Sequence, residues 1–238
     1  MLAQLRQGKQ NCTRMDVMNY TVAEKTSSYT PISNQEIIES TLEGFEKQGF
    51  RLKSENYQVQ NNGNKFIGRF SLNSDETGLD MMFAFKNSYD RTMTAGYALG
   101  AQVFVCLNGV ISGDERMIRK HTGTANVDII TAISEGIKRL PDQFSSVQKD
   151  LNRMKEIEIT QKTINQLVGE MYINDSMLKS RQLEVLRQEI IKPSFDYGVE
   201  GTMYNMYQHI THALKTTPTT DFIQKHIEAH NFILDKIN

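Results

Sequence analysis

The chain has 238 residues, which suits one large domain or two small ones and is enough to bury a hydrophobic core. Its 27 Lys and Arg residues nearly balance its 28 Asp and Glu residues. This net charge of -1 argues against a polyanion binder that is basic throughout, although it leaves room for a local basic patch. The hydrophobic content of 39% excludes a disordered chain, and no apolar run approaches the ~18 residues that a transmembrane helix needs.

The first 30 residues are predicted to form an N-terminal arm, because the stretch up to about residue 16 is polar and aperiodic. This stretch also lacks the apolar middle of a secretion signal. The two cysteines, Cys12 and Cys106, suit a reducing compartment, so we expect a cytoplasmic protein. Cys106 lies in an apolar run and is expected to be a buried free thiol.

The segment 31–123 predicts one helix followed by an antiparallel sheet of four to six strands. The helix starts at a capping box that Ser33 opens and ends at Gly49. Alternating or wholly apolar runs predict the strands, at about residues 50–60, 66–72, 79–85, 101–107 and 110–120. Two stretches, Asn61–Asn64 and Asn108–Gly109, predict hairpin turns, because Asn and Gly accept positive φ.

From Asn126 onward the periodicity is helical. The first of these helices is predicted to end near Leu140, with Pro141 in the first turn of the next. Further helices are predicted at about residues 143–156, 160–172, 178–191, 202–215 and 219–236. The fold class is therefore α+β, with the helix-and-sheet domain at residues 31–140 and an all-helical C-terminal region at residues 141–238.

A polar cluster follows the third predicted strand. It combines an amide, a hydroxyl, a carboxylate and a guanidinium, from Asn87, Ser88, Asp90 and Arg91. One hypothesis is that the cluster holds a phosphate or another polar ligand, since loops on a rigid scaffold often carry sites. The alternative is a turn whose side chains cap their own backbone.

A basic run follows the last predicted strand, with Arg116, Arg119, Lys120 and His121. Lys and Arg donate charge-assisted hydrogen bonds to phosphate, so the run is a candidate phosphate-binding face. The alternative is a sheet edge that charge protects from pairing. With Asn108 of the hairpin turn, the candidate ligand-binding residues are Asn87, Ser88, Asp90, Arg91, Asn108, Arg116, Arg119, Lys120 and His121.

The other four histidines form two pairs on predicted helices. His209 and His212 are three residues apart, and His226 and His230 are four apart, so the members of each pair share a helix face. Four converging imidazoles would suit zinc. We favour packed histidines in a helix interface, because His226 and His230 share their face with isoleucines. We therefore predict no metal site. No catalytic motif or cofactor fingerprint is present, so enzymatic activity has no support.

Four patches in the first half resemble a known family. They are Leu42 with Glu46–Phe50, Asn87–Asp90, Val103–Val110 with Gly113, and Lys120–Gly123. Over about residues 35–140 the chain resembles the phage- and plasmid-related family called domain of unknown function 932. The resemblance implies a setting in bacterial prophages and mobile elements, and hence the cytoplasm of a bacterial host. It brings no established activity, cofactor or catalytic residue.

This setting favours a protein that binds or anneals single-stranded nucleic acid in replication or recombination, and such a role is compatible with a homo-oligomer. The basic run would contact phosphates, and Tyr89 and Tyr97 would stack on bases. A second hypothesis is a counter-defence or regulatory protein that binds a host protein or a nucleotide signal. A third is a structural or assembly protein of a phage particle. The near-neutral net charge weakens only the first hypothesis.

Overall fold

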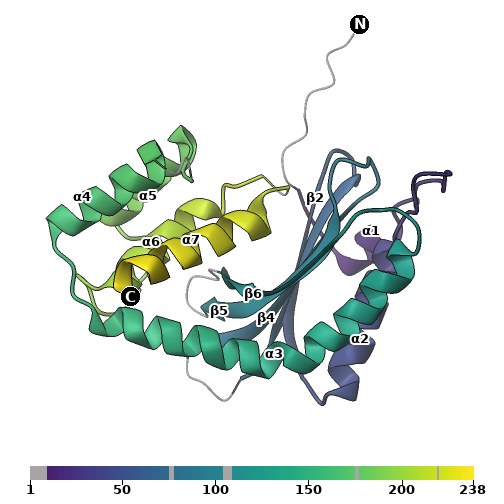
Figure 1. Cartoon of the computed structure of the whole chain (residues 1–238), viewed down its shortest axis with the longest axis horizontal. Coiled ribbons are helices and arrows are strands. Elements are labelled where there is room, and N and C mark those ends of the chain that lie inside the picture. The colour runs from purple at the N-terminus through teal and green to yellow at the C-terminus, as the bar shows by residue number, and fades with distance from the viewer. Residues whose placement is uncertain (1–9, 75–77, 104–108, 175–176, 219) are drawn as a thin grey trace, which may run out of the picture.

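The computed structural model describes residues 10–74, 78–103, 109–174, 177–218 and 220–238. A six-stranded antiparallel sheet occupies the first half of the chain, and helices make up the second half (Figure 1). The predicted α+β class is therefore confirmed. Among the described residues, no helix combines the length and the apolar character that crossing a bilayer requires.

Each strand of the sheet pairs with its neighbours in the sequence. The strands are β1 (Gln10–Cys12), β2 (Leu52–Gln60), β3 (Lys65–Leu72), β4 (Leu79–Ser88), β5 (Ala95–Val103) and β6 (Gly109–Arg119). The first strand and a short helix, α1 (Arg14–Met18), come from the segment that the sequence assigns to an arm. This part of the arm is docked, because β1 pairs with β2 and Val17 is fully buried.

The turn between β2 and β3 forms as its composition predicts. Asn61, Asn62 and Gly63 all have positive φ, at 56°, 55° and 82°. Asn and Gly adopt this left-handed region at the lowest cost, so three consecutive residues of these types can reverse the chain within a few residues.

The hairpin between β5 and β6 differs from its prediction. β5 begins at Ala95 rather than at residue 101, and all of its residues are buried. Helices cover both faces of β5, so its residues do not alternate between apolar and polar side chains. Many of these residues are also small, and the sequence therefore gives no clear strand signal there. The turn expected at Asn108–Gly109 is wrong in position, since Gly109 lies in β6 opposite Gln102, while Asn108 lies outside the described residues. This register buries Ile111, and a strand's register follows its buried side chains.

The sheet is covered on both faces. One face carries aromatic side chains, including Phe45 of α2 (Asn34–Lys47) packed edge-on against Phe70 and Phe83. The helix α3 (Ala125–Glu156) completes this layer. On the opposite face, α7 (Phe222–Ile237) packs against smaller side chains such as Ala84 and Ala98.

One continuous helix replaces the two that Pro141 was expected to separate. The helix α3 runs from Ala125 to Glu156 with Pro141 inside it. Proline removes one hydrogen bond from a helix interior, a cost that usually ends the helix. Here the continuous helix keeps Leu140, Phe144 and Val147 on one buried face, which offsets the loss. In Figure 1, α3 runs from α2 to the C-terminal helices and so links the two halves of the chain.

The remaining helices follow the predicted segments closely. They are α4 (Gln161–Gly169), a π-helix (Glu170–Asn174), α5 (Ser180–Ile191), α6 (Met203–Leu214) and α7. Ser33 caps α2 and accepts a hydrogen bond from the Glu36 backbone N–H, as the sequence predicts. The helical half has its own apolar core, to which α3 contributes Val147, Leu151 and Met154.

We predict that Gly136→Ala destabilises the protein. A Cβ atom at Gly136 of α3 would lie 2.6 Å from atoms of the Tyr97 ring, and this ring is itself buried and stacked on Phe83. The overlap should cost about 1–3 kcal/mol, more than the gain in helix propensity. The matched control is Gly169→Ala, since no atom lies within 4 Å of a Cβ there. Urea denaturation should show a lower midpoint only for Gly136→Ala, and equal midpoints would contradict this packing.

Candidate functional site at one end of the sheet

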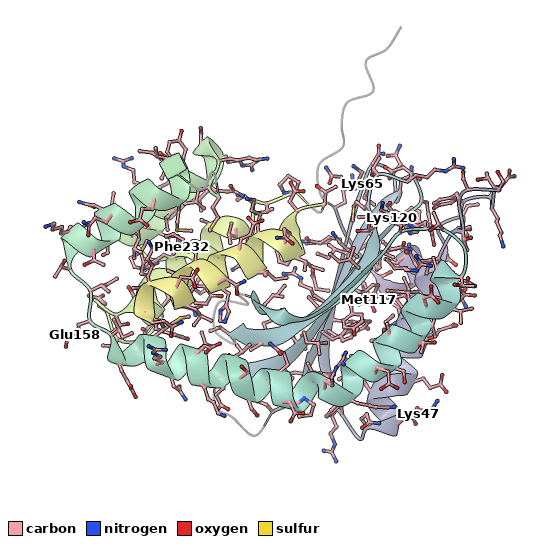
Figure 2. The ribbon with its side chains drawn as sticks, viewed as in Figure 1. Lys47, Lys65, Met117, Lys120, Glu158 and Phe232 are labelled. Atoms are coloured by element: carbon pink, nitrogen blue, oxygen red, sulfur yellow. The ribbon has the colours of Figure 1, made fainter. Side chains whose placement is uncertain are left out.

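Three loops meet at one end of the sheet. The register pairs Lys65 with Ser88 and Ala95 with Arg119. The β2–β3 turn, the β4–β5 turn and residues 120–124 therefore lie at the same end, which we call the loop end. Figure 2 shows Lys65 and Lys120 there, at the upper edge of the view, with Lys47 at the lower edge.

The amide of Asn87 organises the loop end from inside. Asn87 and Ser88 were expected in a loop, but they are the last residues of β4 and are buried. The Nδ2 group of Asn87 donates to the Ile32 carbonyl at 2.7 Å and to Oδ1 of Asn34 at 2.8 Å. Its Oδ1 is then the acceptor for Nε2–H of His121, at 2.8 Å. We call this group the Asn87–His121 network.

Further hydrogen bonds fasten the strap formed by residues 29–34 across the strand ends. The Tyr29 hydroxyl donates to the Ser88 carbonyl at 3.2 Å, and the Asn34 backbone N–H donates to the Tyr89 hydroxyl at 2.9 Å. Thr30 bonds to both sides of the last loop, through its N–H to the His121 carbonyl and its hydroxyl to the Gly123 carbonyl. The strap therefore joins the β4–β5 turn to the segment after β6.

His121 is part of this structure and is not a free ligand donor. Its side chain is buried, and its ring contacts that of Tyr29 with 5.4 Å between centroids. Burial lowers the pKa of His121, because the charged imidazolium would lose its hydration. The neutral form, with its proton on Nε2, fits the bond to Asn87.

The carboxylate of Asp90 caps its own turn. It accepts hydrogen bonds from the backbone N–H of Thr92 at 3.1 Å and from the Thr92 hydroxyl at 2.5 Å. It also accepts one from Nδ2 of Asn61 at 3.1 Å. Partial burial opposes ionisation, but these bonds and the nearby Lys65 lower the pKa of Asp90. Ser88 likewise bonds to the backbone of Met93. Both side chains are used internally.

The basic candidates separate into an anchored and an exposed group. Arg119 is anchored, because its Nε donates to Asp128 of α3 at 2.8 Å and its Nη2 to the Thr122 carbonyl at 3.3 Å. Lys120 and Arg91 are exposed. Arg91 has a φ of 62°, which is uncommon for a side chain of this size, and its guanidinium lies 4.6 Å from the centre of the Tyr29 ring.

Two expectations for the site are corrected by burial. Tyr89 and Tyr97 are only 7% and 2% exposed, so neither ring can stack on a base. Asn87, Ser88 and His121 are similarly enclosed and cannot touch a ligand directly. Of the remaining candidates, Arg116 lies in β6 opposite Ala98, and Asn108 is outside the described residues.

The sequence reasoning missed three residues of the loop end, namely Tyr29, Asn34 and Lys65. Tyr29 and Asn34 act through the strap, and each lies more than fifty residues away in the sequence from its partner at the end of β4. No local pattern links such distant positions. Lys65 directly follows the predicted turn, and this position beside a turn on the same hairpin was the only signal for it.

Three histidines of the helical half, His209, His212 and His230, are hydrogen-bonded within it. His230 is fully buried and bonds through Nε2 to Asp150 of α3 at 3.0 Å and through Nδ1 to the Tyr207 hydroxyl at 3.1 Å. His212 bonds through Nδ1 to the Tyr197 hydroxyl at 3.1 Å. In the part of the chain that the structure describes, no three His, Cys, Asp or Glu side chains could together hold a metal ion.

We expect Asn87→Ala to be strongly destabilising. The substitution removes three buried hydrogen bonds and leaves the Ile32 carbonyl, Asn34 and His121 without this partner. Such losses cost about 2–4 kcal/mol in total. Asn64→Ala is the control, since it removes one exposed bond to the Asn61 carbonyl. Chemical denaturation that gave both variants the same stability would contradict the role of Asn87.

The stability of the protein should fall with acid partly through His121. Because the pKa of His121 is lower in the folded state than its usual 6.5, the unfolded chain binds more protons between these two values. The contribution of neutral His121 to the free energy of unfolding is therefore complete above about pH 6.5, and it is lost as the pH falls through the folded-state pKa. His209 and His212 are shifted in the same direction, chiefly by burial. The variant His121→Gln can still donate to Asn87. In denaturation experiments between pH 7.5 and 5, its free energy of unfolding should fall less steeply than that of the unmodified protein. An unchanged slope would contradict this assignment.

Comparison with known protein families finds a match over most of the chain. The family model described as Domain of unknown function (DUF932) matches residues 23–227. This range includes the strap, the whole loop end and most of the helical half, so the match extends well beyond the patches at residues 35–140. No curated protein and no solved structure matches the chain. The match covers most of the sequence, and the chain therefore belongs to the DUF932 family.

Proposed function

We propose that the chain binds single-stranded nucleic acid at the loop end, as an accessory protein of a phage or plasmid. The observation that carries the proposal is the gathering of three cations at the loop end, namely Lys65 at the start of β3, Arg91 in the β4–β5 turn and Lys120 directly after β6. Phosphate contacts from Lys and Arg supply most of the affinity of proteins that bind nucleic acid without reading its sequence.

The charges at the loop end favour binding of an anion. The carboxylate of Asp90 is occupied by Thr92 and Asn61, and that of Asp128 is occupied by Arg119 and Thr124. Lys65, Arg91 and Lys120 form no ion pair with another described residue. Their positive charge is therefore available to phosphates even though the chain as a whole is nearly neutral.

Arg91 offers the loop end a surface on which a base can stack. The central carbon of its guanidinium lies 4.6 Å from the centre of the Tyr29 ring, and the Tyr29 hydroxyl is bonded to the Ser88 carbonyl. Bases of single strands stack on arginine planes as well as on aromatic rings. This role replaces the one expected of Tyr89 and Tyr97. The left-handed φ of Arg91 also suits a functional position, because backbone strain gathers at sites.

An acidic groove next to the loop end limits the surface that a strand can follow. It is lined by Glu36, Glu39 and Glu43 of α2 together with Asn126 at the start of α3. Phosphates would be repelled from this groove. A bound strand would therefore run across the loops and away from α2.

The proposal predicts salt-dependent binding that is lost with the loop-end cations. Lys65→Ala combined with Lys120→Ala should weaken binding of a fluorescent 30-nucleotide single strand. It should also reduce the slope of log K against log salt by about 1.4, since each phosphate contact on a single strand contributes roughly 0.7. Fluorescence anisotropy between 50 and 200 mM NaCl measures both quantities.

The matched control combines Lys47→Ala with Lys138→Ala. It removes the same charge, but Lys47 and Lys138 lie in exposed ion pairs with Glu43 and Glu135. The control should bind as the unmodified protein does. The proposal fails if the unmodified protein shows no salt-dependent binding, or if the two double variants bind equally well. Arg119 is left unchanged, because its bond to Asp128 would make any loss of binding ambiguous.

A further inference from the structure

The helices α4 and α5 hold an apolar groove between them. The groove has a volume of about 550 Å³, and residues of both helices line it. In Figure 1 the two helices lie at the upper left, on the opposite side of the molecule from α2. Apolar side chains follow one another in the groove at helical spacing. They are Ile164 and Val168 of α4 and Leu183, Leu186, Ile190 and Ile191 of α5.

These apolar side chains are only partly covered. The helix α5 packs closely against α6, but it approaches α4 much less closely. Ile164, Val168, Leu183 and Ile190 are therefore half-buried, and Ile191 is 70% exposed. A continuous apolar groove between surface helices is typical of a docking site for helices of another protein chain.

A second hollow extends the groove toward α6. It has a volume of about 400 Å³ and shares Gln161, Ile164, Ile190 and Ile191 with the groove. Twelve residues line each hollow and four of them are shared, so twenty residues form one surface, which we call the α4–α5 face. A protein interface of standard size uses roughly 20–30 residues from each partner. The α4–α5 face is thus large enough for a protein partner.

The charges on the α4–α5 face suit a second copy of this chain. Its Glu and Arg residues are Glu184, Arg187 and Glu200, so it has no surplus of positive charge for phosphates. Glu184 and Arg187 lie one turn apart on α5, and both are exposed. They form a loose ion pair of 3.8 Å between Oε1 and Nη1. Exposed pairs of this kind contribute little, so each member can pair with another chain at little cost.

We propose that two copies of the chain form a dimer through the α4–α5 face. In a contact with two-fold symmetry, each pair of touching residues occurs twice. If the two α5 helices run antiparallel across the axis, Glu184 of each copy lies beside Arg187 of the partner subunit. Ile191 and its apolar neighbours are then covered by the other copy, as in a four-helix bundle. The dimer goes beyond the proposed function and does not depend on it, because no loop-end cation belongs to this face.

Sedimentation velocity of the full chain tests the dimer. Between about 1 and 200 µM the protein should change from monomer to dimer, and a protein that stays monomeric at 200 µM overturns the proposal. Ile191→Lys should weaken the dimer about tenfold or more, because it places two cations in the apolar contact. The matched control is Val127→Lys, since Val127 is also exposed, at 60%, but lies on α3 outside the α4–α5 face. This control should dimerise as the unmodified protein does.

An exchange of charges tests the pairing of the two copies. Glu184→Arg alone and Arg187→Glu alone should each weaken the dimer about tenfold or more, because like charges then meet twice across the axis. A mixture of these two variants should form a mixed dimer with nearly the original affinity. All of these side chains are exposed, so the variants are expected to fold.

The proposal is overturned if the variants at Ile191, Glu184 and Arg187 dimerise as well as the unmodified protein, or if the mixture of charge variants stays monomeric. The double variant Lys65→Ala with Lys120→Ala should form the dimer with unchanged affinity. Failure of the dimer can therefore be distinguished from failure of nucleic-acid binding.

Discussion

Inside β4, one amide group makes three hydrogen bonds that join parts of the chain far apart in sequence. Asn87 bonds to Ile32 and Asn34 of the strap and to His121 beyond β6. A buried amide whose protons are all hydrogen-bonded stabilises the fold only while all of its partners stay in place. The position of each loop at the loop end therefore depends on the others. This network acts as the support beneath the surface that carries Lys65, Arg91 and Lys120.

The polar residues that first suggested a site thus belong to two layers. Asn87, Ser88 and His121 form the inner layer, which is buried and holds the loops. The outer layer consists of side chains that reach solvent, including Arg91 and Lys120. Rigid support beneath exposed charged groups lowers the conformational cost of binding. Because the outer layer gathers exposed cations at one place, a chain with a net charge of -1 can still present a local surface suited to an anion.

Local signals predicted much of the fold. The Ser33 cap, the left-handed turn at Asn61–Gly63 and most helices could be identified because each depends on neighbouring residues. The features that were missed depend on distant contacts. Pro141 is tolerated because residues after it are buried in the core of the helical half. The start of β5 was hidden because both its faces are covered. The Asn87–His121 network joins the strap, β4 and the segment after β6, so no single stretch of sequence could reveal it.

Cross-linking would test most directly whether the loop end is the surface that meets nucleic acid. A single-stranded oligonucleotide carrying 5-iodouridine can be irradiated with the protein, and mass spectrometry can then identify the attached peptides. The account predicts cross-links in the β2–β3 turn, in the β4–β5 turn next to Arg91 and in the segment around Lys120. Cross-links found only on other surfaces, such as the helices α4 and α5, would contradict it.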